Sequence, residues 1–565
     1  MTWETVLLLV LSTFSVFNAQ NINYRDVRIS QGVVRGYKLQ EQNIVTFYGI
    51  PYATAPTGLD FYKAPLSPPT WNETFEATDQ TIRCQQPSSN SDGFQEQCLI
   101  ANVLVPDTET QNLPVVVFVH GGAFLFGSGN DDQPRSLVKT GRMIAVTFNY
   151  RLGPQGFLCL GTEAAPGNAA MKDQVALLRW VQTNIDKFGG NPNDVTIAGC
   201  SAGSSSVDLL VISKMAKGLF HKAIAGSGAN INPFSVQTQP LDNAKLFARL
   251  VGFNNTEDIA ALENFYLDTP YEVILRNSIQ LMSRTDSVTL FAPCLERDIG
   301  QEIFLDESPE KIIRNGDYVK TPMLYGYTEM EGIFRINEFD TWKTKMNEDF
   351  VDFISPNLGD DEEERRTLAN DIKSFYFGDE IVSNSSILKY IDYFTDVMFG
   401  YGMLRSAKLQ LEAGNDQLYL YEYSFVDESV PYIPHTQIRG ATHCTQFEAV
   451  LDLPNENEIS EEYKRMKVVM RELWLNFIVN GAPVSEGSSY PSWPPMTPER
   501  SYMSLNSTLE YKDSLVPERV KFWDNITDNY ARHPSPPNPN NGSIQLTNNS
   551  LLYLVLFVIY SVYLL

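Results

Sequence analysis

The sequence predicts an α/β fold with a mostly parallel central sheet, helices on both faces of the sheet and a single large domain. Three observations support this prediction. Short runs of β-branched and aromatic residues, typical of strands buried on both faces, recur along the chain. Segments with helical periodicity separate these runs. No internal repeat and no change of composition divides the 565 residues before a Pro/Asn-rich stretch near the C-terminus.

The expected elements alternate along the chain. The clearest helix covers residues 168–188, and Gly189-Gly190 provides its stop. Its apolar positions recur at near-helical spacing: Val175, Leu178, Val181 and Ile185. A second helical run extends to Val211, and the segment GLFHKAIAG around His221 suggests a third. The expected strands are 115–120, 143–150, 194–199, 322–327 and 417–425.

Composition and charge exclude two classes of protein. Hydrophobic residues make up 43% of the chain and aromatic residues 12%, enough to bury a large core, so the chain is not intrinsically disordered. Lys and Arg number 43 against 68 Asp and Glu, which gives a net charge of −25. A surface of this sign repels a phosphate backbone, and nucleic acid is not expected as a partner.

The N-terminus is typical of an exported protein. Residues 1–19 form a predicted signal peptide with an apolar run over 6–17 and cleavage after Ala19, so the mature body is expected to cover residues 20–531. Cys84 and Cys98 are close enough in sequence to cross-link in an oxidising compartment. Five sequons within the body are glycosylation candidates: Asn72, Asn254, Asn384, Asn506 and Asn525.

The C-terminus resembles a lipid-attachment signal. Residues 532–542 are a Pro/Asn-rich stretch expected to leave the folded body as an extended linker. Residues 543–565 end in an uninterrupted apolar tail. Small residues from Asn541 to Ser543, a polar spacer and this tail match a glycosylphosphatidylinositol signal, with Asn541 as the candidate attachment site on the outer membrane leaflet. A single-span tail and an uncleaved hydrophobic end are the alternatives.

Ser201 is the candidate nucleophile. It lies in Gly199-Cys200-Ser201-Ala202-Gly203, directly after an expected strand and before a helical run. This is the context in which G-x-S-x-G forms a nucleophile elbow. The sharp turn brings the flanking residues close together, and glycine alone tolerates that approach.

A serine hydroxyl needs an imidazole base and an acid that orients it. Of the five histidines, His120 precedes a glycine pair, His221 falls in an expected helix and His533 lies in the linker. His443 follows a strand and is favoured as the base, while His435 is expected in a surface loop.

Two carboxylates follow the strand over 322–327, and spacing does not distinguish Glu329 from Glu331 as the acid. The order Ser, Glu, His is that of α/β-hydrolases.

Gly121 and Gly122 follow another strand, and their amides with that of Ala202 would form a three-donor oxyanion hole. This chemistry requires no metal and no organic cofactor.

The motifs resemble the type-B carboxylesterase and cholinesterase family of α/β-hydrolases. Within this family, they are most similar to those of secreted insect carboxylesterases. The resemblance extends from about residue 28 to 523. The matching segments include FYGIPYA (47–53), VHGGA (119–123), NYRLG (149–153), residues 165–190, GCSAG (199–203), KGLF (217–220), Glu331-Gly332 and GATH (440–443).

The resemblance carries several implications. It selects Glu331 as the acid, because the family's carboxylate directly precedes Gly. It implies that Cys84 and Cys98 form a disulfide and that Arg151 pairs with Asp173. All three triad positions are filled, unlike in the adhesion members of the family.

Two departures from the family pattern bear on the pocket. The loop between Cys84 and Cys98 holds no Trp, so acetylcholine is not expected as a substrate. Cys200 occupies the elbow position where the family usually has Glu, and Cys444 follows the base. These two cysteines are expected to be neighbouring small apolar residues, with a disulfide as the alternative. Cys159 and Cys294 are expected to be buried thiols.

The expected function is a serine esterase acting on small-molecule carboxylic esters through an acyl-enzyme. Odorant or pheromone esters, dietary esters and xenobiotics are candidate substrates. The alternative is a catalytically weak cell-surface adhesion or ligand-scavenging protein of the same fold. No sequence feature specifies an oligomeric state.

Overall fold

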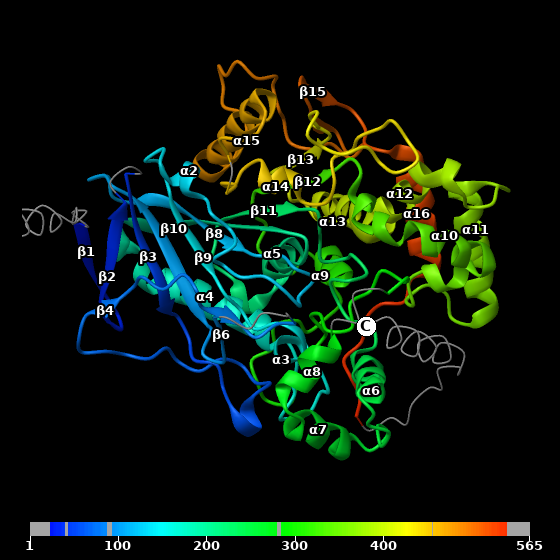
Figure 1. Ribbon diagram of the computed structural model, residues 1–565, viewed down its shortest axis with the longest axis horizontal. Helices are drawn as coiled ribbons and strands as arrows, with labels where there is room; N and C mark the ends of the chain where they lie inside the picture. Colours follow the sequence, from blue (N-terminus) through cyan, green and yellow to red (C-terminus); the bar gives the residue numbers. More distant parts are fainter. Residues whose placement is uncertain (1–22, 40–42, 88–92, 279–283, 455, 540–565) are drawn as a thin grey trace, which may run out of the picture.

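One large sheet runs through the molecule, and helices cover both of its faces (Figure 1). The computed structural model describes residues 23–39, 43–87, 93–278, 284–454 and 456–539. The predicted signal peptide, Asn541 and the apolar tail lie outside the described residues. Neighbouring strands of the sheet follow the order β1-β2-β3-β7-β9-β8-β10-β11-β12-β13-β14-β15, and β4 pairs with β2.

The strands have these bounds: β1 (Asn23–Ile29), β2 (Gly32–Leu39), β3 (Ile44–Pro51), β4 (Phe75–Glu76), β5 (Arg83–Cys84), β6 (Phe94–Gln95), β7 (Ile100–Pro106), β8 (Leu113–Val119), β9 (Ile144–Phe148), β10 (Gly190–Cys200), β11 (Lys222–Gly226), β12 (Met323–Thr328), β13 (Leu418–Tyr423), β14 (Tyr502–Leu505) and β15 (Leu509–Lys512).

The centre of the sheet is parallel, as predicted. From β9 through β8, β10, β11, β12 and β13 to β14, every neighbouring pair is parallel. Each of the five predicted strands overlaps one of these, namely β8, β9, β10, β12 and β13. The α/β fold class with a mostly parallel central sheet in one domain is therefore confirmed.

The strands at the edges of the sheet are antiparallel, and they are not among the strands predicted from the sequence. At one edge β1, β2, β3 and β7 pair in antiparallel fashion, and β15 pairs with β14 at the other. In β1, buried Val27 and Ile29 alternate with exposed residues. A strand with one solvated face lacks the continuous apolar run that identified the central strands, which explains why β1 was not predicted. Strands β3 and β7 are almost fully buried, but Thr46 and Asn102 interrupt their apolar runs.

The expected helix around His221 is wrong. Residues Lys222–Gly226 form the buried strand β11 between β10 and β12. The segment is too short for a helix to bury one face, whereas a central parallel strand buries both. His221 precedes this strand, and its Nδ1 accepts a hydrogen bond from the Val195 N–H at 3.1 Å.

Strand β8 shows why both faces of the sheet are covered. Successive side chains point to opposite faces, so Val115, Val117 and Val119 join one apolar core and Val116 and Phe118 join the other. The second core contains Trp474 of α15, whose ring stacks on Phe118 with centroids 6.3 Å apart. Helices α4 and α5 pack against β10 on the first face.

The helices have these bounds: α2 (Arg135–Val138), α3 (Gly153–Phe157), α4 (Ala169–Asn184), α5 (Ala202–Ile212), α6 (Pro240–Leu250), α7 (Ile259–Asp268), α8 (Tyr271–Ser278), α9 (Pro309–Asn315), α10 (Phe339–Glu348), α11 (Glu362–Phe377), α12 (Ile387–Thr395), α13 (Tyr401–Glu412), α14 (Thr445–Glu448), α15 (Glu461–Asn480) and α16 (Pro517–Tyr530). The predicted helix over 168–188 is α4 followed by a 3-10 turn, which ends at Gly189 with φ 95°.

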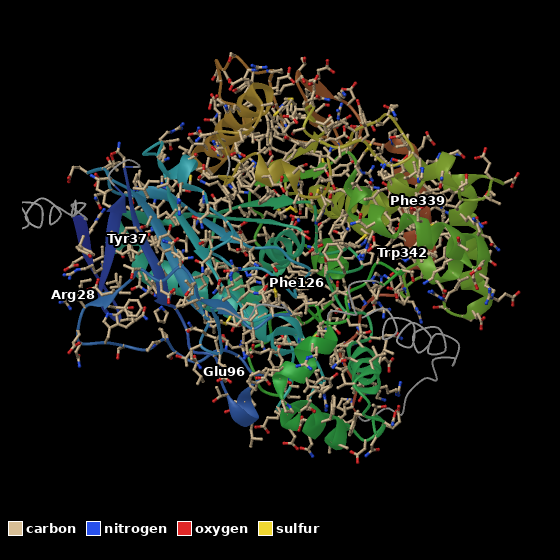
Figure 2. All side chains as sticks on the ribbon, viewed as in Figure 1. Arg28, Tyr37, Glu96, Phe126, Phe339 and Trp342 are labelled. Atoms are coloured by element: carbon tan, nitrogen blue, oxygen red, sulfur yellow. A yellow bond between two sulfur atoms is a disulfide. The ribbon has the colours of Figure 1, made fainter. Side chains whose placement is uncertain are left out.

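A group of helices stands beside the sheet at the right of Figure 1, where α10, α11, α12 and α16 lie together. Two short elements connect this helical layer to the sheet. The 3-10 helix η5 (Glu331–Glu338) leaves the end of β12, and the π-helix η8 (Asp396–Gly400) joins α12 to α13. Figure 2 shows Phe339 and Trp342 in this layer, on the opposite side of the molecule from Arg28 and Tyr37 of the first strands.

The predicted linker begins in contact with the body. The Arg532 N–H donates to the Asn357 carbonyl at 2.7 Å, and the Arg532 Nη2 donates to the Pro356 carbonyl. Pro537 packs against Gly161. Within the described part of this stretch, residues 532–539, there is no helix or strand, and the chain lies along the body as far as Pro537.

Arg151 and Asp173 form a buried ion pair, as the resemblance implies. Both side chains are fully buried, and Arg151 donates from Nε at 2.8 Å and from Nη2 at 2.6 Å to the two carboxylate oxygens. The Arg151 N–H donates to the same carboxylate at 3.1 Å. This pair fixes the end of β9 to α4, below the loop that leads to α3.

Replacement of Asp173 by Asn tests this anchor. Asn keeps the shape of Asp but not its charge, so D173N leaves the Arg151 guanidinium buried without its counter-charge. We expect the free energy of unfolding in urea to fall by about 3–5 kcal/mol. The matched control is E302Q in the exposed Arg179–Glu302 pair, where the loss should stay below about 1 kcal/mol. Equal losses in the two variants would contradict a structural role for the buried pair.

Candidate active site

Ser201 stands at a sharp turn between β10 and α5. Its backbone is in the left-handed region, with φ 60° and ψ −127°. A Cβ added at Gly199 would lie 2.5 Å from the Gly203 carbonyl, and one added at Gly203 would lie 2.1 Å from the Val119 oxygen. Both distances are impossible for a real side chain, so glycine is required on each side of Ser201, as the sequence predicts.

Glu331 holds His443. The His443 Nδ1 lies 2.5 Å from the Glu331 Oε2. Glu331 is fully buried, and its other oxygen accepts hydrogen bonds from the Ser227 hydroxyl and, at 2.8 Å, from the Thr328 N–H. A carboxylate held in this way fixes the orientation of the imidazole and stabilises its protonated form.

Sequence spacing does not distinguish Glu329 from Glu331 as the acid, but the Glu329 carboxyl has charged neighbours of its own. Its carboxyl interacts electrostatically with Asp392, Lys512 and Arg519, and burial raises its pKa. The choice of Glu331 therefore rests on the direct contact with His443. Ser227 and Gln446, whose side chains bond to each other at 2.6 Å, support Glu331 from below. Neither residue belongs to a recognisable sequence motif.

His443 is enclosed by aromatic rings, and the other candidate bases lie elsewhere. The Phe399 ring stacks on the imidazole at 4.1 Å, and the Phe334 ring lies at 5.1 Å. His435 is 37% exposed and lies 3.9 Å from Asp340, in a surface loop as predicted. His120 is buried and stacks on Tyr150, and burial lowers its pKa to about 4.

A disulfide joins the residue before Ser201 to the residue after His443. Cys200 and Cys444 are bonded, with their Cα atoms 6.1 Å apart. The expectation of two apolar thiols is therefore wrong. The two cysteines are 244 residues apart in sequence, and only the meeting of the elbow with the histidine loop brings them together. The bond limits how far Ser201 and His443 can move apart.

The remaining cysteines are also paired. Cys84 and Cys98 form the disulfide that the resemblance implies. Cys159 and Cys294 form another, so their expected role as free thiols is wrong. Pairing over 135 residues depends on the fold and has no local sequence signal. All six cysteines of the chain are thus in disulfides.

The predicted oxyanion amides lie beside Ser201. A Cβ added at Gly121 would lie 3.3 Å from the Ser201 Cβ and 2.7 Å from the Cys200 carbonyl oxygen. The Tyr150 hydroxyl donates to the His120 carbonyl at 2.7 Å and holds this glycine loop in place. Among the described residues, no hydrogen bond uses the N–H of Gly121 or Gly122, and Ala202 begins α5, where helix N–H groups lack partners within the helix.

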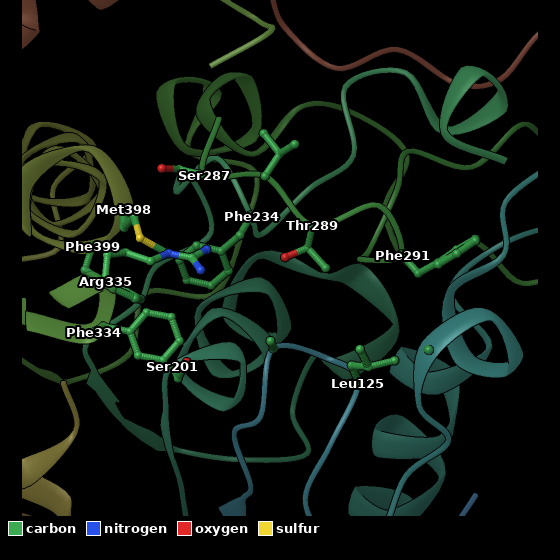
Figure 3. Close-up of a pocket in the computed structure, with 13 residues that line it drawn as sticks. Leu125, Ser201, Phe234, Ser287, Thr289, Phe291, Phe334, Arg335, Met398 and Phe399 are labelled. Carbon is green, nitrogen blue, oxygen red and sulfur yellow. The ribbon is translucent and has the colours of Figure 1, made fainter. Parts of the chain in front are cut away.

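A pocket opens over Ser201 and contains about 620 Å³ of empty space, counting the part open to solvent. Its lining is mostly apolar, with Leu125, Phe234, Met398 and Phe399 among the residues labelled in Figure 3. Phe291 also lines the pocket, as the one residue of the range 291–305 that does so. Within the described residues, no group of His, Cys, Asp or Glu side chains could hold a metal ion.

The structure thus brings Glu331, His443 and the surroundings of Ser201 together. Phe334 and Phe399 line the same pocket as Ser201 and also contact the His443 ring. No hydrogen bond between Ser201 and His443 occurs within the described part of the chain. The arrangement has the components for acyl transfer: a partly buried serine that lines the pocket, an oriented imidazole and neighbouring backbone donors.

The Cys200–Cys444 bond should position Ser201 and His443. In the double variant C200S/C444S, we expect labelling of Ser201 by a fluorophosphonate to slow by about ten-fold or more, because small displacements of reacting groups are costly. The free energy of unfolding should fall by about 2–4 kcal/mol. Labelling rates are measured by gel or mass spectrometry on folded protein.

The matched control is C159S/C294S, which removes a disulfide outside the elbow. We expect a comparable loss of stability and a labelling rate within about two-fold of the unmodified protein. Equal slowing in both double variants would show that the Cys200–Cys444 bond acts only on stability.

Comparison with known proteins agrees with this geometry. The family model described as "Carboxylesterase family" matches residues 23–523. A juvenile hormone esterase from Heliothis virescens is 32% identical over 540 residues, covering 89% of this chain and 92% of that protein. Esterase FE4 from Myzus persicae is 32% identical over 517 residues, covering 87% and 90%.

Solved structures show the same relationship. The crystal structure of juvenile hormone esterase from Manduca sexta, with OTFP covalently attached, is similar with a TM-score of 0.79 and 27% identity, covering 90% of this chain and all of that one. A PNB esterase is similar with a TM-score of 0.69 and 30% identity, covering 88% and 99%. With its α/β-hydrolase fold, the chain belongs to the carboxylesterase family and is a carboxylic ester hydrolase.

Proposed function

We propose that the protein is a serine esterase in which Ser201, His443 and Glu331 form the catalytic triad. The observation that carries this proposal is the contact between the His443 Nδ1 and the buried Glu331 carboxylate. The His443 ring packs against Phe334 and Phe399, which line the pocket into which Ser201 opens. The disulfide between the neighbours of Ser201 and His443 supports the same pairing.

The proposed reaction begins with attack of the Ser201 Oγ on the ester carbonyl. The proton of the hydroxyl passes to the His443 Nε2, and the Nδ1–H of the resulting imidazolium remains hydrogen-bonded to Glu331. The oxyanion accepts hydrogen bonds from the amides of Gly121, Gly122 and Ala202. His443 then gives the proton to the leaving alcohol, and water, activated by His443, releases the acid from the acyl-enzyme.

The lack of a Ser201–His443 hydrogen bond is compatible with this proposal. Catalytic hydrogen bonds are often long in free enzymes and form when substrate is bound. The Cys200–Cys444 bond joins the residues next to Ser201 and His443 and so limits the separation of the two loops.

The apolar pocket supports small, uncharged esters as substrates. Eight of its lining side chains are aromatic, aliphatic or thioether groups: Ala123, Leu125, Phe234, Val288, Phe291, Phe334, Met398 and Phe399. Burial of such surface favours apolar acyl chains and alcohols. Odorant or pheromone esters, dietary esters and xenobiotics are the candidate classes.

Substitution of Ser201 tests the mechanism. We expect S201A to lose fluorophosphonate labelling and to hydrolyse p-nitrophenyl esters at least about 10⁴-fold more slowly than the unmodified protein, because an activated nucleophile acts together with its base. Rates over a series of rising acyl length also define the depth of the pocket.

The same measurements distinguish the alternative function. Absence of labelling in folded, unmodified protein would favour an adhesion or ligand-binding role. Labelling with an initial burst but no steady turnover would favour a scavenger that is acylated and not released.

We further propose that the protein is exported, glycosylated and attached to the outer leaflet through Asn541. All five candidate asparagines in the body are exposed, which supports their glycosylation. Among the described residues no helix has the length and apolar character needed to cross a bilayer.

The anchor can be tested on cells that express the full chain. Phosphatidylinositol-specific phospholipase C should release the esterase into the medium, because a glycosylphosphatidylinositol anchor is cut between lipid and protein. A chain that ends at residue 540 should be secreted without treatment. Retention of the full chain on treated cells would instead indicate a spanning tail.

A further inference from the structure

The apolar pocket has one strongly polar wall. Arg335 lies on η5, four residues after Glu331, and is 7% exposed. At Arg335 the backbone leaves the helical region, with φ −105° and ψ 17°, so η5 kinks at this residue. Figure 3 shows the Arg335 side chain among the residues that line the pocket, beside Phe399 and Met398.

Aromatic rings and a carboxylate fix the position of this guanidinium. The Arg335 Cζ lies 5.2 Å from the centre of the Phe334 ring and 5.5 Å from that of Trp342. The Arg335 Nη1 lies 3.7 Å from the Glu338 carboxylate. Phe334 also contacts His443, so the guanidinium is held next to the ring that borders the proposed base.

Ser287 provides a second polar group in the same pocket. It is 2% exposed, and its Oγ is buried without a hydrogen-bond partner among the described residues. An unsatisfied buried hydroxyl costs free energy unless a ligand or water bonds to it. Its backbone has φ 62°, a conformation that is unusual for Ser. Thr289 lies two residues further along the same wall.

The charges near Arg335 limit what this wall can bind. Glu338 and Asp286 both interact electrostatically with the guanidinium. Arg284 also pairs with Asp286, so the two carboxylates balance the two guanidinium groups of this region. A substrate carboxylate would find no uncompensated positive charge here, on a chain whose net charge is −25. A neutral oxygen needs no such charge, and a guanidinium with five N–H groups can serve it together with its protein partners.

We propose that Arg335 and Ser287 form a polar subsite that recognises a neutral hydrogen-bond acceptor on the ester. The acceptor is a carbonyl, ether or hydroxyl oxygen carried by the acyl chain or the alcohol. This inference rests on the proposed esterase function and deepens it by naming the substrate class. The enzyme prefers esters that are apolar along most of their length and carry one acceptor oxygen away from the scissile bond.

Two pairs of esters test the subsite, one for each side of the scissile bond. The acyl pair is p-nitrophenyl hexanoate and p-nitrophenyl 5-oxohexanoate. The alcohol pair is the acetate of hexan-1-ol and the acetate of 6-hydroxyhexan-2-one. Each pair differs by one neutral carbonyl group. The measured quantity is the ratio of kcat/KM for the keto ester to that for the alkyl ester.

In at least one pair, we expect the unmodified enzyme to prefer the keto ester by about ten-fold, the usual effect of a hydrogen bond from a charged donor. R335M should abolish this preference, and S287A should lower it by about three-fold. The matched control is R366M at an exposed position of α11, which should leave the ratio unchanged. Fluorophosphonate labelling shows that each variant is folded.

The outcomes separate the subsite from the esterase function. Hydrolysis of the alkyl esters with the same ratio in R335M, S287A and unmodified enzyme would overturn the subsite alone. A preference for p-nitrophenyl hydrogen glutarate that R335M removes would show a carboxylate site and overturn the neutral acceptor. Failure of the unmodified enzyme to hydrolyse any ester would overturn the proposed function itself. If R335M does not fold, the kcat/KM ratio measured for S287A tests the subsite in its place.

Discussion

The close packing of three backbone segments at Ser201 is the constraint on which the site depends. Gly199 and Gly203 touch each other and the end of β8, and Gly121 lies against the Cys200 carbonyl. The turn that exposes the serine and the loop that offers backbone amides are therefore parts of one packed unit. No side chain fits between these segments, so the proposed oxyanion donors cannot move away without disrupting the central sheet.

The other two proposed catalytic groups, Glu331 and His443, reach this unit from later strands. Glu331 begins η5 at the end of β12, and His443 lies in the loop after β13. Parallel strands bring their carboxyl ends to one edge of the sheet, which is why residues more than 100 positions apart meet there. The Cys200–Cys444 bond adds a covalent connection between the elbow and the histidine loop. The sheet sets the approximate positions of these groups, and the disulfide restricts the distance between the elbow and the histidine loop.

The sequence was informative wherever a local pattern has a steric or packing cause. The elbow around Ser201 and the central strands could be predicted because glycine spacing and continuous apolar runs are local properties. The strand Lys222–Gly226 and the edge strands could not, since their burial depends on neighbours supplied by the fold. The same reason applies to Cys200 with Cys444 and Cys159 with Cys294, whose pairing is a tertiary event.

The residues that we propose to set specificity belong to a different part of the molecule than the proposed catalytic groups. Phe334, Arg335, Met398 and Phe399 belong to η5 and η8, which join the helical layer to the sheet. These elements pack on each other and on α12, and they contribute no strand to the sheet. Substitutions there can change the polarity of the pocket while the buried Glu331 contact is retained. Arg335 illustrates this separation. It follows Glu331, the proposed acid, by four residues on one short helix, yet it lines the pocket beside Ser201, while the Glu331 carboxylate bonds to Ser227, Thr328 and His443.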